Sequence, residues 1–397
     1  MESLERWQGD DRRSGGERRK LIESSFLGPD VRTGKDRRFR GDSSRFKIRP
    51  VVTKPEQAAT VLNDKIEQYI QQLGNLETLC NQSNVDQEKL LSDITMQTDS
   101  MLETCAKFEQ HVSDKYTIKA AQLYFRDKTN HIVSKSYCIN RCRTWPRGQQ
   151  GDFETLELAY KNYPLSEGIG YYLDKYLLSS TVGVAVRERI IKLRELLQEE
   201  LKSRHAPRVL NLACGSCREV FELATEIKSS GAKFICVDLD SNALDFARDR
   251  FSHAGLLSDS VELLTYNALR MFDYETAEKE FGLQDIIYSV GYFDYLPDDF
   301  LVKLLNTLYK LLNPGGSLIM AFKDAARYRS QVYHWLVDWD GFKQRVVPDF
   351  DRVLHLAEIP SSALSVTRAG SGTIIFYLAK KNNPHATGEK QAAQSSS

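Results

Sequence analysis

The stretch that most constrains the fold runs from Arg208 to Asp240 and reads RVLNLACGSCREVFELATEIKSSGAKFICVDLD. It begins with a short apolar run typical of a buried strand, which leads into a loop of small residues at 213–217. Apolar residues then recur at helical spacing, and a second strand-like run ends at Asp238. This order predicts a strand–loop–helix–strand unit in which Gly215 lets a ligand approach the backbone and Asp238 accepts hydrogen bonds from a ribose.

The loop also distinguishes between two nucleotide ligands. An NAD-binding loop needs a third glycine where this sequence has Arg218, which would crowd the pyrophosphate and hold the helix away from the strand. S-adenosylmethionine (SAM) has no pyrophosphate, and residues 210–217 resemble the "LxxGCGxG" loop of class I SAM-dependent methyltransferases. The loop departs from that pattern at three positions, since Asn211 replaces an acid and Ala213 and Cys217 replace glycines.

Later segments follow the order of the same family. A strand-like run at 261–264 leads to Asn267, and another run at 284–290 forms the expected fourth strand. An Asn-Pro-Gly-Gly turn at 313–316 then precedes a further apolar run. The resemblance implies an α/β, Rossmann-like fold with a mostly parallel seven-stranded sheet, preceded by an N-terminal helical region.

The resemblance also implies a SAM cofactor and the residues around it. Asp238 is expected to hold the ribose hydroxyls, Gly215 and its neighbours the methionine moiety, and Asn267 the adenine edge. The full set expected around SAM is Asn211, Ala213, Cys214, Gly215, Asp238, Leu239, Asn267, Ala268 and Ser289.

A more specific resemblance lies upstream of the loop. Residues 146–160 are similar to a "PRGYxGDxExxxxxY" element, with Gln149 in place of its tyrosine, and residues 185–189 match an "AVRxR" helix. Residues 291–297 and 337–339 are similar to the "GLxDYL" and "LDW" segments of the same subgroup. The subgroup comprises bacterial methyltransferases assigned to making the methyl ester of a 3-hydroxy fatty acid. The resemblance therefore implies a small or lipid-like carboxylic acid as the methyl acceptor.

Methyl transfer to a carboxylate needs alignment and exclusion of water but no general base, because the carboxylate is already a nucleophile. It does need a cationic clamp, and guanidinium binds carboxylate through two hydrogen bonds. Arg147, Arg187 and Arg189 are the candidates, and each is equally suited to a structural ion pair. Asp294 and Tyr295 follow the fourth strand, near the expected position of the transferred methyl. We predict that they are catalytic, with loop capping and core packing as the alternative.

Composition limits the compartment and the partners. Charges balance over 397 residues, so bulk electrostatics do not favour nucleic acid, and no apolar run approaches the ~20 residues that span a bilayer. The first residues are charged where a signal peptide is apolar, and the seven cysteines lack framework spacing. We expect a cytoplasmic protein without a transmembrane segment. The sequence pattern indicates no metal site, and a thioredoxin-like use of Cys214 and Cys217 would need a much smaller domain.

The chain is predicted to have five segments. They are a disordered basic arm at 1–50, a helical hairpin at 51–115, a helical lid or substrate-binding region at 116–205, the SAM-binding catalytic domain at 206–381 and a disordered tail at 382–397. The arm suits either binding to an acidic partner, a membrane surface or nucleic acid, or a solvated, disordered tail. Its interleaved acids make nucleic acid a weaker candidate. The hairpin, with its turn at 81–86, suits either a homodimer interface or a cap on the catalytic domain.

Two other functions fit the same residues. One is methyl transfer to a different acceptor, such as a small-molecule hydroxyl, an amine or RNA, of which nucleic acid is the least favoured. The other is a regulatory or scaffold protein that keeps a degenerate SAM-binding fold, which the departures at Asn211, Ala213 and Cys217 motivate. SAM binding that is lost on Asp238→Ala would count against this second alternative.

Overall fold

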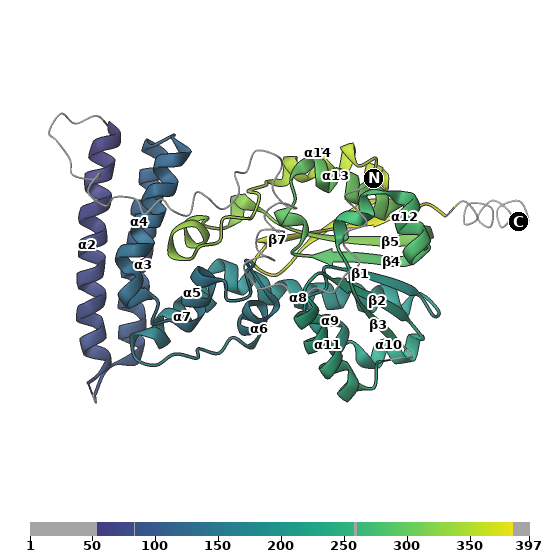
Figure 1. Cartoon of the computed structure of the whole chain (residues 1–397), viewed down its shortest axis with the longest axis horizontal. Coiled ribbons are helices and arrows are strands. Elements are labelled where there is room, and N and C mark those ends of the chain that lie inside the picture. The colour runs from purple at the N-terminus through teal and green to yellow at the C-terminus, as the bar shows by residue number, and fades with distance from the viewer. Residues whose placement is uncertain (1–53, 83, 258–259, 384–397) are drawn as a thin grey trace, which may run out of the picture.

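The computed structural model describes residues 54–82, 84–257 and 260–383. The predicted arm at 1–50 and nearly all of the predicted tail therefore lie outside the described residues. Figure 1 shows a bundle of long helices at one end of the molecule and a sheet flanked by helices at the other. Shorter helices connect the two parts.

The sheet has seven strands in the order β3-β2-β1-β4-β5-β7-β6. Strands β1 to β5 pair in parallel, while β7 lies antiparallel between β5 and β6. The predicted Rossmann-like fold with a mostly parallel seven-stranded sheet is thereby confirmed. The strands are β1 (Arg208–Leu212), β2 (Lys233–Asp238), β3 (Val261–Thr265), β4 (Gln284–Val290), β5 (Leu312–Lys323), β6 (Leu364–Arg368) and β7 (Ile374–Lys380).

Helices cover both faces of the sheet because successive side chains of a strand point to opposite faces. Within β1, Val209 packs into one core, while Leu210 and Leu212 pack into the other. The first core is covered by α8 (Thr181–Lys202), α9 (Arg218–Glu222), α10 (Ala224–Ser230) and α11 (Ser241–Ala254), and the second by α12 (Tyr274–Phe281), α13 (Asp298–Lys310) and α14 (Val347–Leu356). Both faces of the sheet are thus covered by helices. A ligand would therefore bind at the loops that follow the carboxyl ends of the parallel strands.

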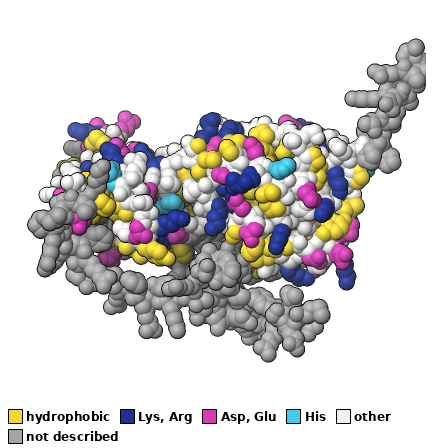
Figure 2. Space-filling model, turned by 90° about the horizontal axis from the view of Figure 1, so that it is seen from above, with side chains coloured by type: hydrophobic (Ala, Val, Ile, Leu, Met, Phe, Trp, Pro, Cys, Tyr) yellow, Lys and Arg dark blue, Asp and Glu magenta, His cyan; other side chains and the backbone are white. Residues whose placement is uncertain are grey.

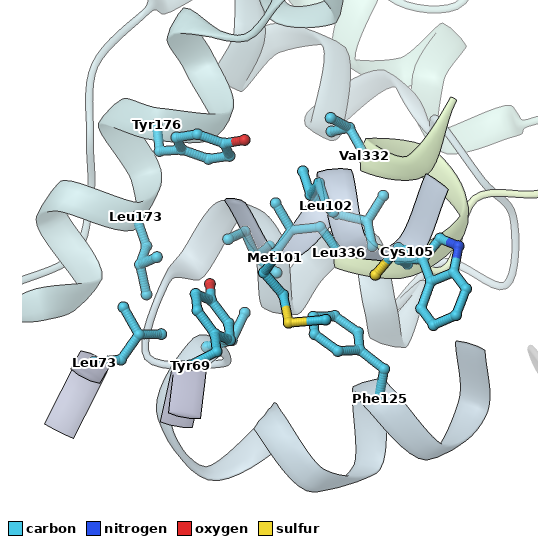
Figure 3. Packing of buried hydrophobic residues seen from close by; sticks show 14 of the residues in the cluster. Tyr69, Leu73, Met101, Leu102, Cys105, Phe125, Leu173, Tyr176, Val332 and Leu336 are labelled. Atoms are coloured by element: carbon cyan, nitrogen blue, oxygen red, sulfur yellow. The ribbon is translucent and has the colours of Figure 1, made fainter. Parts of the chain in front are cut away.

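The N-terminal helices form a third core (Figure 3). Helices α2 (Lys54–Cys80) and α3 (Gln87–His111) pack against each other on either side of the predicted turn. Their apolar residues recur every third or fourth position and face α4 (Lys115–Val133) and α7 (Ile169–Ser179). Figure 3 shows Tyr69, Leu73 and Met101 of the hairpin gathered with Leu173 and Tyr176 of α7. The apolar face of the hairpin is therefore buried within the chain.

A segment from the far end of the sequence completes this helical core. Trp335 lies in the short π-helical turn η7 (Val332–Leu336) and is fully buried. Its ring makes edge contacts with Phe108 and Phe125, each at 6.0 Å between centroids, and its Nε1 donates to Glu109 at 2.7 Å. The helical bundle and the α/β domain are therefore joined by shared packing.

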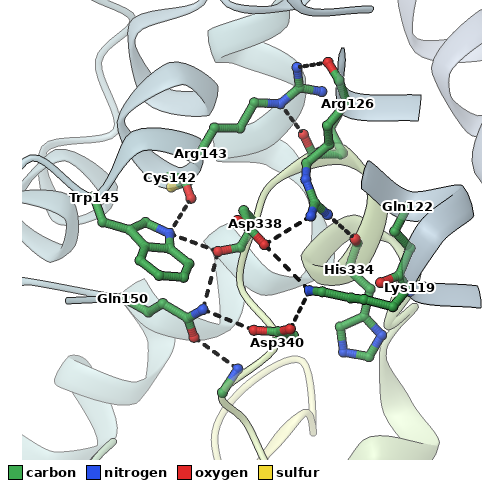
Figure 4. Close-up of polar contacts among 12 residues, drawn as sticks. Lys119, Gln122, Arg126, Cys142, Arg143, Trp145, Gln150, His334, Asp338 and Asp340 are labelled. Atoms are coloured by element: carbon green, nitrogen blue, oxygen red, sulfur yellow. Dashed lines mark hydrogen bonds and ion pairs between the residues drawn. The ribbon is translucent and has the colours of Figure 1, made fainter. Parts of the chain in front are cut away.

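Polar contacts fix the same segment on its other side (Figure 4). The Arg126 guanidinium pairs with Asp338 at 3.1 Å, and Lys119 pairs with Asp340. Arg143 follows in α5 (Tyr137–Thr144) and donates to a backbone carbonyl of η7 at 2.8 Å. Burial lowers the pKa of Arg143 to about 10, and the positive charge of Arg126 adds to this effect. These cations hold residues 336–340 against α4 and α5.

We expect Trp335→Ala to lower the free energy of unfolding by about 3–5 kcal/mol, because it removes a fully buried aromatic ring. Urea denaturation followed by circular dichroism measures this change. The matched control is Tyr116→Ala on α4, whose side chain is 88% exposed and whose loss should change stability by less than about 0.5 kcal/mol. Equal losses in the two variants would contradict the shared core.

Candidate functional site

The loop after β1 has a left-handed backbone at every second residue. Ala213 has a φ of 53°, Gly215 of 54° and Cys217 of 48°. Only glycine adopts this conformation freely, and a residue with a Cβ costs roughly 1–2 kcal/mol there. The two positions where the sequence lacks the expected glycines therefore keep a glycine-like backbone. A hydrogen bond of 3.0 Å from the Cys214 N–H to the carbonyl of Val237 ties the loop to β2.

Asp238 ends β2 and is bonded to this loop. Its carboxylate accepts from the Gly215 N–H at 2.7 Å and from the Asp240 N–H at 2.9 Å. Burial raises the pKa of Asp238, although the two backbone bonds oppose that rise. A carboxylate has about four lone-pair positions, so each oxygen retains capacity for a further donor. The carboxylate thus lies beside the loop in the position expected for binding a diol.

The end of β3 lies beside Asp238. The Tyr266 N–H donates to the Asp238 carbonyl at 2.8 Å, which places Asn267 and Ala268 next along this edge. The Asn267 side chain accepts from the Leu269 N–H at 3.0 Å and caps the short 3₁₀ helix η4 (Ala268–Phe272). Leu239 is 45% exposed at the tip of β2 and offers an apolar surface there.

Two residues predicted to contact SAM are instead buried in the sheet. Ser289 donates to the carbonyl of Leu212 at 2.7 Å and so ties β4 to β1. Asn211 donates to Glu219 at 2.8 Å. The structure therefore directs both side chains toward protein partners. Glu219, which the sequence reasoning missed, brings a buried carboxylate to the position that lacks the usual acid, and burial raises its pKa.

The predicted catalytic pair is also engaged by the protein. Asp294 is buried, and its carboxylate accepts from the backbone N–H of Lys323 at 3.1 Å and from its ammonium group at 2.8 Å. The Tyr295 hydroxyl accepts from Nε1 of Trp339 at 2.8 Å, and burial raises the pKa of this hydroxyl. These contacts brace the end of β5 and the segment after η7, and a catalytic role for either residue stays a prediction.

Of the three arginines proposed as a clamp, two have other partners. Arg147 pairs with Glu154 at 2.6 Å and stacks over the ring of Phe153 at 4.6 Å. Arg187 donates to the carbonyl of Ala159 at 3.3 Å. Both positions therefore favour the structural alternative.

Arg189 differs from both because it is buried without a carboxylate partner. The residue is 4% exposed, and among the residues that the structure describes no carboxylate lies within ion-pair distance of it. Its Nη2 donates to the hydroxyl of Tyr160 at 3.3 Å, and its Nε has no partner within hydrogen-bond distance. Asp294 and Glu219 are the nearby acids, and each is bonded to other groups.

Gly291 makes room for this guanidinium at the end of β4. A Cβ at Gly291 would lie 2.7 Å from Nη1 of Arg189, and its φ is 97°. A side chain there would meet both a steric clash and a strained backbone. The guanidinium therefore lies against the carboxyl end of β4, on the same edge of the sheet as Asp238 and the loop at 213–217.

A second loop covers this edge. Gln149 donates to Asp240 at 3.5 Å, so residues 145–151 extend toward the end of β2. Gln150 donates to Asp340 at 3.1 Å, and the Gly341 N–H donates back to it at 2.8 Å. Figure 4 shows Trp145, Gln150, Asp338 and Asp340 joined in one network. The site is therefore closed on this side by residues that the helical part holds in place.

These groups fit SAM by their chemistry. Asp238 would bind the ribose hydroxyls, the loop at 213–217 would leave space for the methionine moiety, and Leu239 would offer apolar surface to the adenine. SAM, when bound, supplies an electrophilic methyl group on a sulfonium.

Residues 209–316 match the family model described as "Methyltransferase domain". No curated protein matches the chain. A solved structure of a possible exported protein from Bordetella parapertussis is 17% identical, with a TM-score of 0.49, over 81% of this chain and 97% of that chain.

Two other solved structures are similar over about half of the chain. One is an O-methyltransferase family protein from Burkholderia thailandensis, 16% identical with a TM-score of 0.39, over 51% of this chain and 60% of that chain. The other is a magnesium protoporphyrin IX methyltransferase from Synechocystis with bound SAM, 13% identical with a TM-score of 0.36, over 51% and 84%.

The fold and the family match define a class of enzyme. The chain carries a methyltransferase domain. The predicted enzyme class and its SAM cofactor are confirmed at this level. Among residues 54–82, 84–257 and 260–383, no helix is both long and apolar enough to cross a membrane.

We expect Asp238→Ala to weaken SAM binding by about 100-fold, because it removes the carboxylate expected to bind the diol and releases the Gly215 N–H. Calorimetric titration with SAM and S-adenosylhomocysteine measures the affinity. The matched control is Asp245→Ala on α11, an exposed carboxylate away from the loop, which should bind SAM as the wild type does. Unchanged affinity in a folded Asp238→Ala protein would place the cofactor elsewhere.

Proposed function

We propose that this enzyme transfers the methyl group of SAM to a carboxylic acid and releases a methyl ester. The observation that carries the proposal is Arg189, a guanidinium that is 4% exposed and has no carboxylate partner among the described residues. Such a cation cannot lose its charge, and its burial carries a desolvation cost that Tyr160, Asp294 and Tyr295 offset from nearby without a direct ion pair. An anionic ligand in contact with it would remove that cost.

Charge near the site supports an anionic acceptor. Lys323 is a second buried cation, and Asp294 neutralises it at 2.8 Å. Asp294 is therefore not available to Arg189. Glu219 is the remaining acid, and its Oε1 accepts from Asn211 and Tyr288, each at 2.8 Å. Near this edge of the sheet, Arg189 is thus a buried cation that no carboxylate of the described residues contacts, and it would meet the carboxylate of a ligand.

Methyl transfer to a carboxylate requires little chemistry of the protein's own side chains. The acceptor oxygen forms the new bond to the methyl carbon while the bond from that carbon to sulfur breaks, and no proton has to be removed. Arg189 would hold the carboxylate by charge-assisted bonds, which are stronger out of water. Asp294 and Tyr295 would act by supporting the site, which agrees with their bonds to Lys323 and Trp339.

The neighbouring rings suit an acceptor with an apolar part. Tyr295 contacts Phe342 with 4.6 Å between ring centroids, and Trp339 stacks on Phe342 at 5.4 Å. A small or lipid-like acid, such as the 3-hydroxy fatty acid implied by the resemblance, is therefore the acceptor that we propose. A hydroxyl, an amine or RNA remains the alternative acceptor. We further propose a cytoplasmic location, and a homodimer through α2 and α3 stays a prediction.

We expect Arg189→Gln to lower kcat/KM for carboxylic acids by about 100-fold or more, because it removes one side of a buried, charge-assisted contact. The assay follows radiolabelled methyl transfer from SAM to 3-hydroxy fatty acids of graded length, with the matching alcohols and amides beside them. An ester releases volatile methanol in alkali, which separates it from an ether or a methylamine. Arg194→Gln, on the same helix but paired with Glu222, is the control and should retain activity.

The same variant separates two sources of the carboxylate. If Arg189 holds the acceptor, the affinity for SAM should change less than about threefold while acceptor use collapses. If it holds the methionine end of the cofactor, the SAM affinity should fall by the same factor as kcat/KM. Wild-type kinetics and affinity in Arg189→Gln would refute the proposed clamp, and methylation of alcohols or amides instead of acids would refute the acceptor.

Gly291→Ala tests the placement of Arg189 while leaving its charge in the protein. The new Cβ would lie 2.7 Å from Nη1, so the guanidinium must shift. We expect a loss of kcat/KM of about tenfold or more, with circular dichroism unchanged, since sub-ångström misplacement of a binding group is costly. Retained activity would mean that the guanidinium does not need this position.

A further inference from the structure

Helix α6 (Phe153–Lys161) lies between the cofactor loop and Arg189. Its residues Glu157 and Tyr160 are one turn apart and therefore lie on the same face of the helix. Glu157 reaches the loop after β1, and Tyr160 reaches Arg189. One short helix thus contacts both halves of the site.

Glu157 is a buried carboxylate whose bonding positions are filled by three partners. It is 4% exposed and accepts from the hydroxyl of Ser216 at 2.8 Å, from Arg218 at 3.0 Å and from Arg250 at 2.9 Å. Burial favours its neutral form, but the bonds from Arg250 and Ser216 outweigh that effect and lower its pKa. The side chain is therefore ionised at neutral pH and fixed by charge-assisted bonds.

The loop held by Glu157 is the strained one. Ser216 lies between Gly215 and Cys217, both of which have a left-handed backbone. On one side the Gly215 N–H is bonded to Asp238, and on the other Ser216 is bonded to Glu157. Strained backbone persists where its surroundings determine it, and here α6 supplies one of the two fixed points.

The same helix is fixed mainly by polar contacts. Of its nine residues, only Phe153 and Glu157 are buried. Its N-terminal cap, Asp152, accepts two bonds of 2.8 Å from Arg141. The placement of α6 therefore depends on these few polar contacts, and a ligand that alters the loop or Arg189 acts directly on two of them.

We propose that α6 couples the cofactor site to the anion site, with Glu157 as the positioning residue for the loop and Tyr160 as the contact to Arg189. The proposal rests on the proposed function, since it takes Arg189 as the anion-binding group. Each ligand favours the same placement of α6. Binding one therefore raises the affinity for the other by an equal factor, as linkage requires.

The first measurement uses the full chain with S-adenosylhomocysteine and 3-hydroxydecanoate as probes. We expect saturating S-adenosylhomocysteine to lower the Kd for 3-hydroxydecanoate about tenfold in calorimetry, within the range typical of coupled sites. In Glu157→Gln the ratio of the two Kd values should fall close to one. In Tyr160→Phe the ratio should also fall, while affinity for S-adenosylhomocysteine alone stays at the wild-type value. Lys161→Gln, at an exposed position of the same helix, should keep the full coupling.

The second measurement does not depend on the acceptor. Hydrogen exchange followed by mass spectrometry should show that S-adenosylhomocysteine slows amide exchange in residues 153–161 of the wild type but not of Glu157→Gln. If Glu157→Gln does not fold, Ser216→Ala removes a single bond to Glu157 and should weaken the same protection.

These outcomes separate two failures. A wild type that does not bind 3-hydroxydecanoate but shows cofactor-dependent protection of α6 refutes the proposed acceptor and retains the link from cofactor to helix. Wild-type coupling and protection in Glu157→Gln overturn the role of Glu157. Absence of protection in the wild type overturns the coupling by α6.

Discussion

A buried guanidinium without a carboxylate is costly, and several features of the α/β domain accommodate the one at Arg189. Gly291 lacks the Cβ that would collide with it, and Asp294 is directed to Lys323 instead of neutralising it. Tyr160 offers a single neutral acceptor at 3.3 Å. Among the described residues this guanidinium therefore has no carboxylate in direct contact, and the proposed anion site rests on that arrangement. A group whose environment is matched to a ligand and not to the protein itself is the expected property of a binding site.

The N-terminal helices contribute to this site through a segment from the other end of the chain. Trp335 is anchored among α3 and α4, and four residues later Trp339 donates to the hydroxyl of Tyr295. Between them Asp338 accepts from Trp145 and pairs with Arg126, so that the loop at 145–151 and α4 meet on the same residues. Weakening the helical core should therefore loosen the cover over the end of β2. This gives the long N-terminal addition a role beyond the methyltransferase domain.

The parallel strands could be predicted because both faces of the sheet are covered, which requires continuous apolar runs. Strand β6 was missed because it is an edge strand with no fully buried residue and hence no such run. Arg189 carried a usable signal, since it lies in the apolar stripe of α8 formed by Ala185, Val186, Ile190 and Leu193. A charge at a core position distinguishes it from Arg147. No sequence pattern predicted the contact between Glu219 and Asn211, because the two residues meet only in the folded chain.

The scaffold alternative rests on the departures of the loop from the family pattern, and the geometry bears on each departure. Ala213 and Cys217 keep a left-handed backbone, which costs roughly 1–2 kcal/mol for each residue. A loop with no need of this conformation would be more stable with an ordinary backbone at both positions. The Gly215 N–H donates to Asp238, and the side chain of Asn211 donates to the carboxylate of Glu219. A fold kept only for scaffolding would gain stability by relaxing this loop and by pairing or removing Arg189. The strained loop lies on the same edge of the sheet as Arg189, which has no carboxylate partner among the described residues. The proposed binding of a cofactor beside an anion accounts for both.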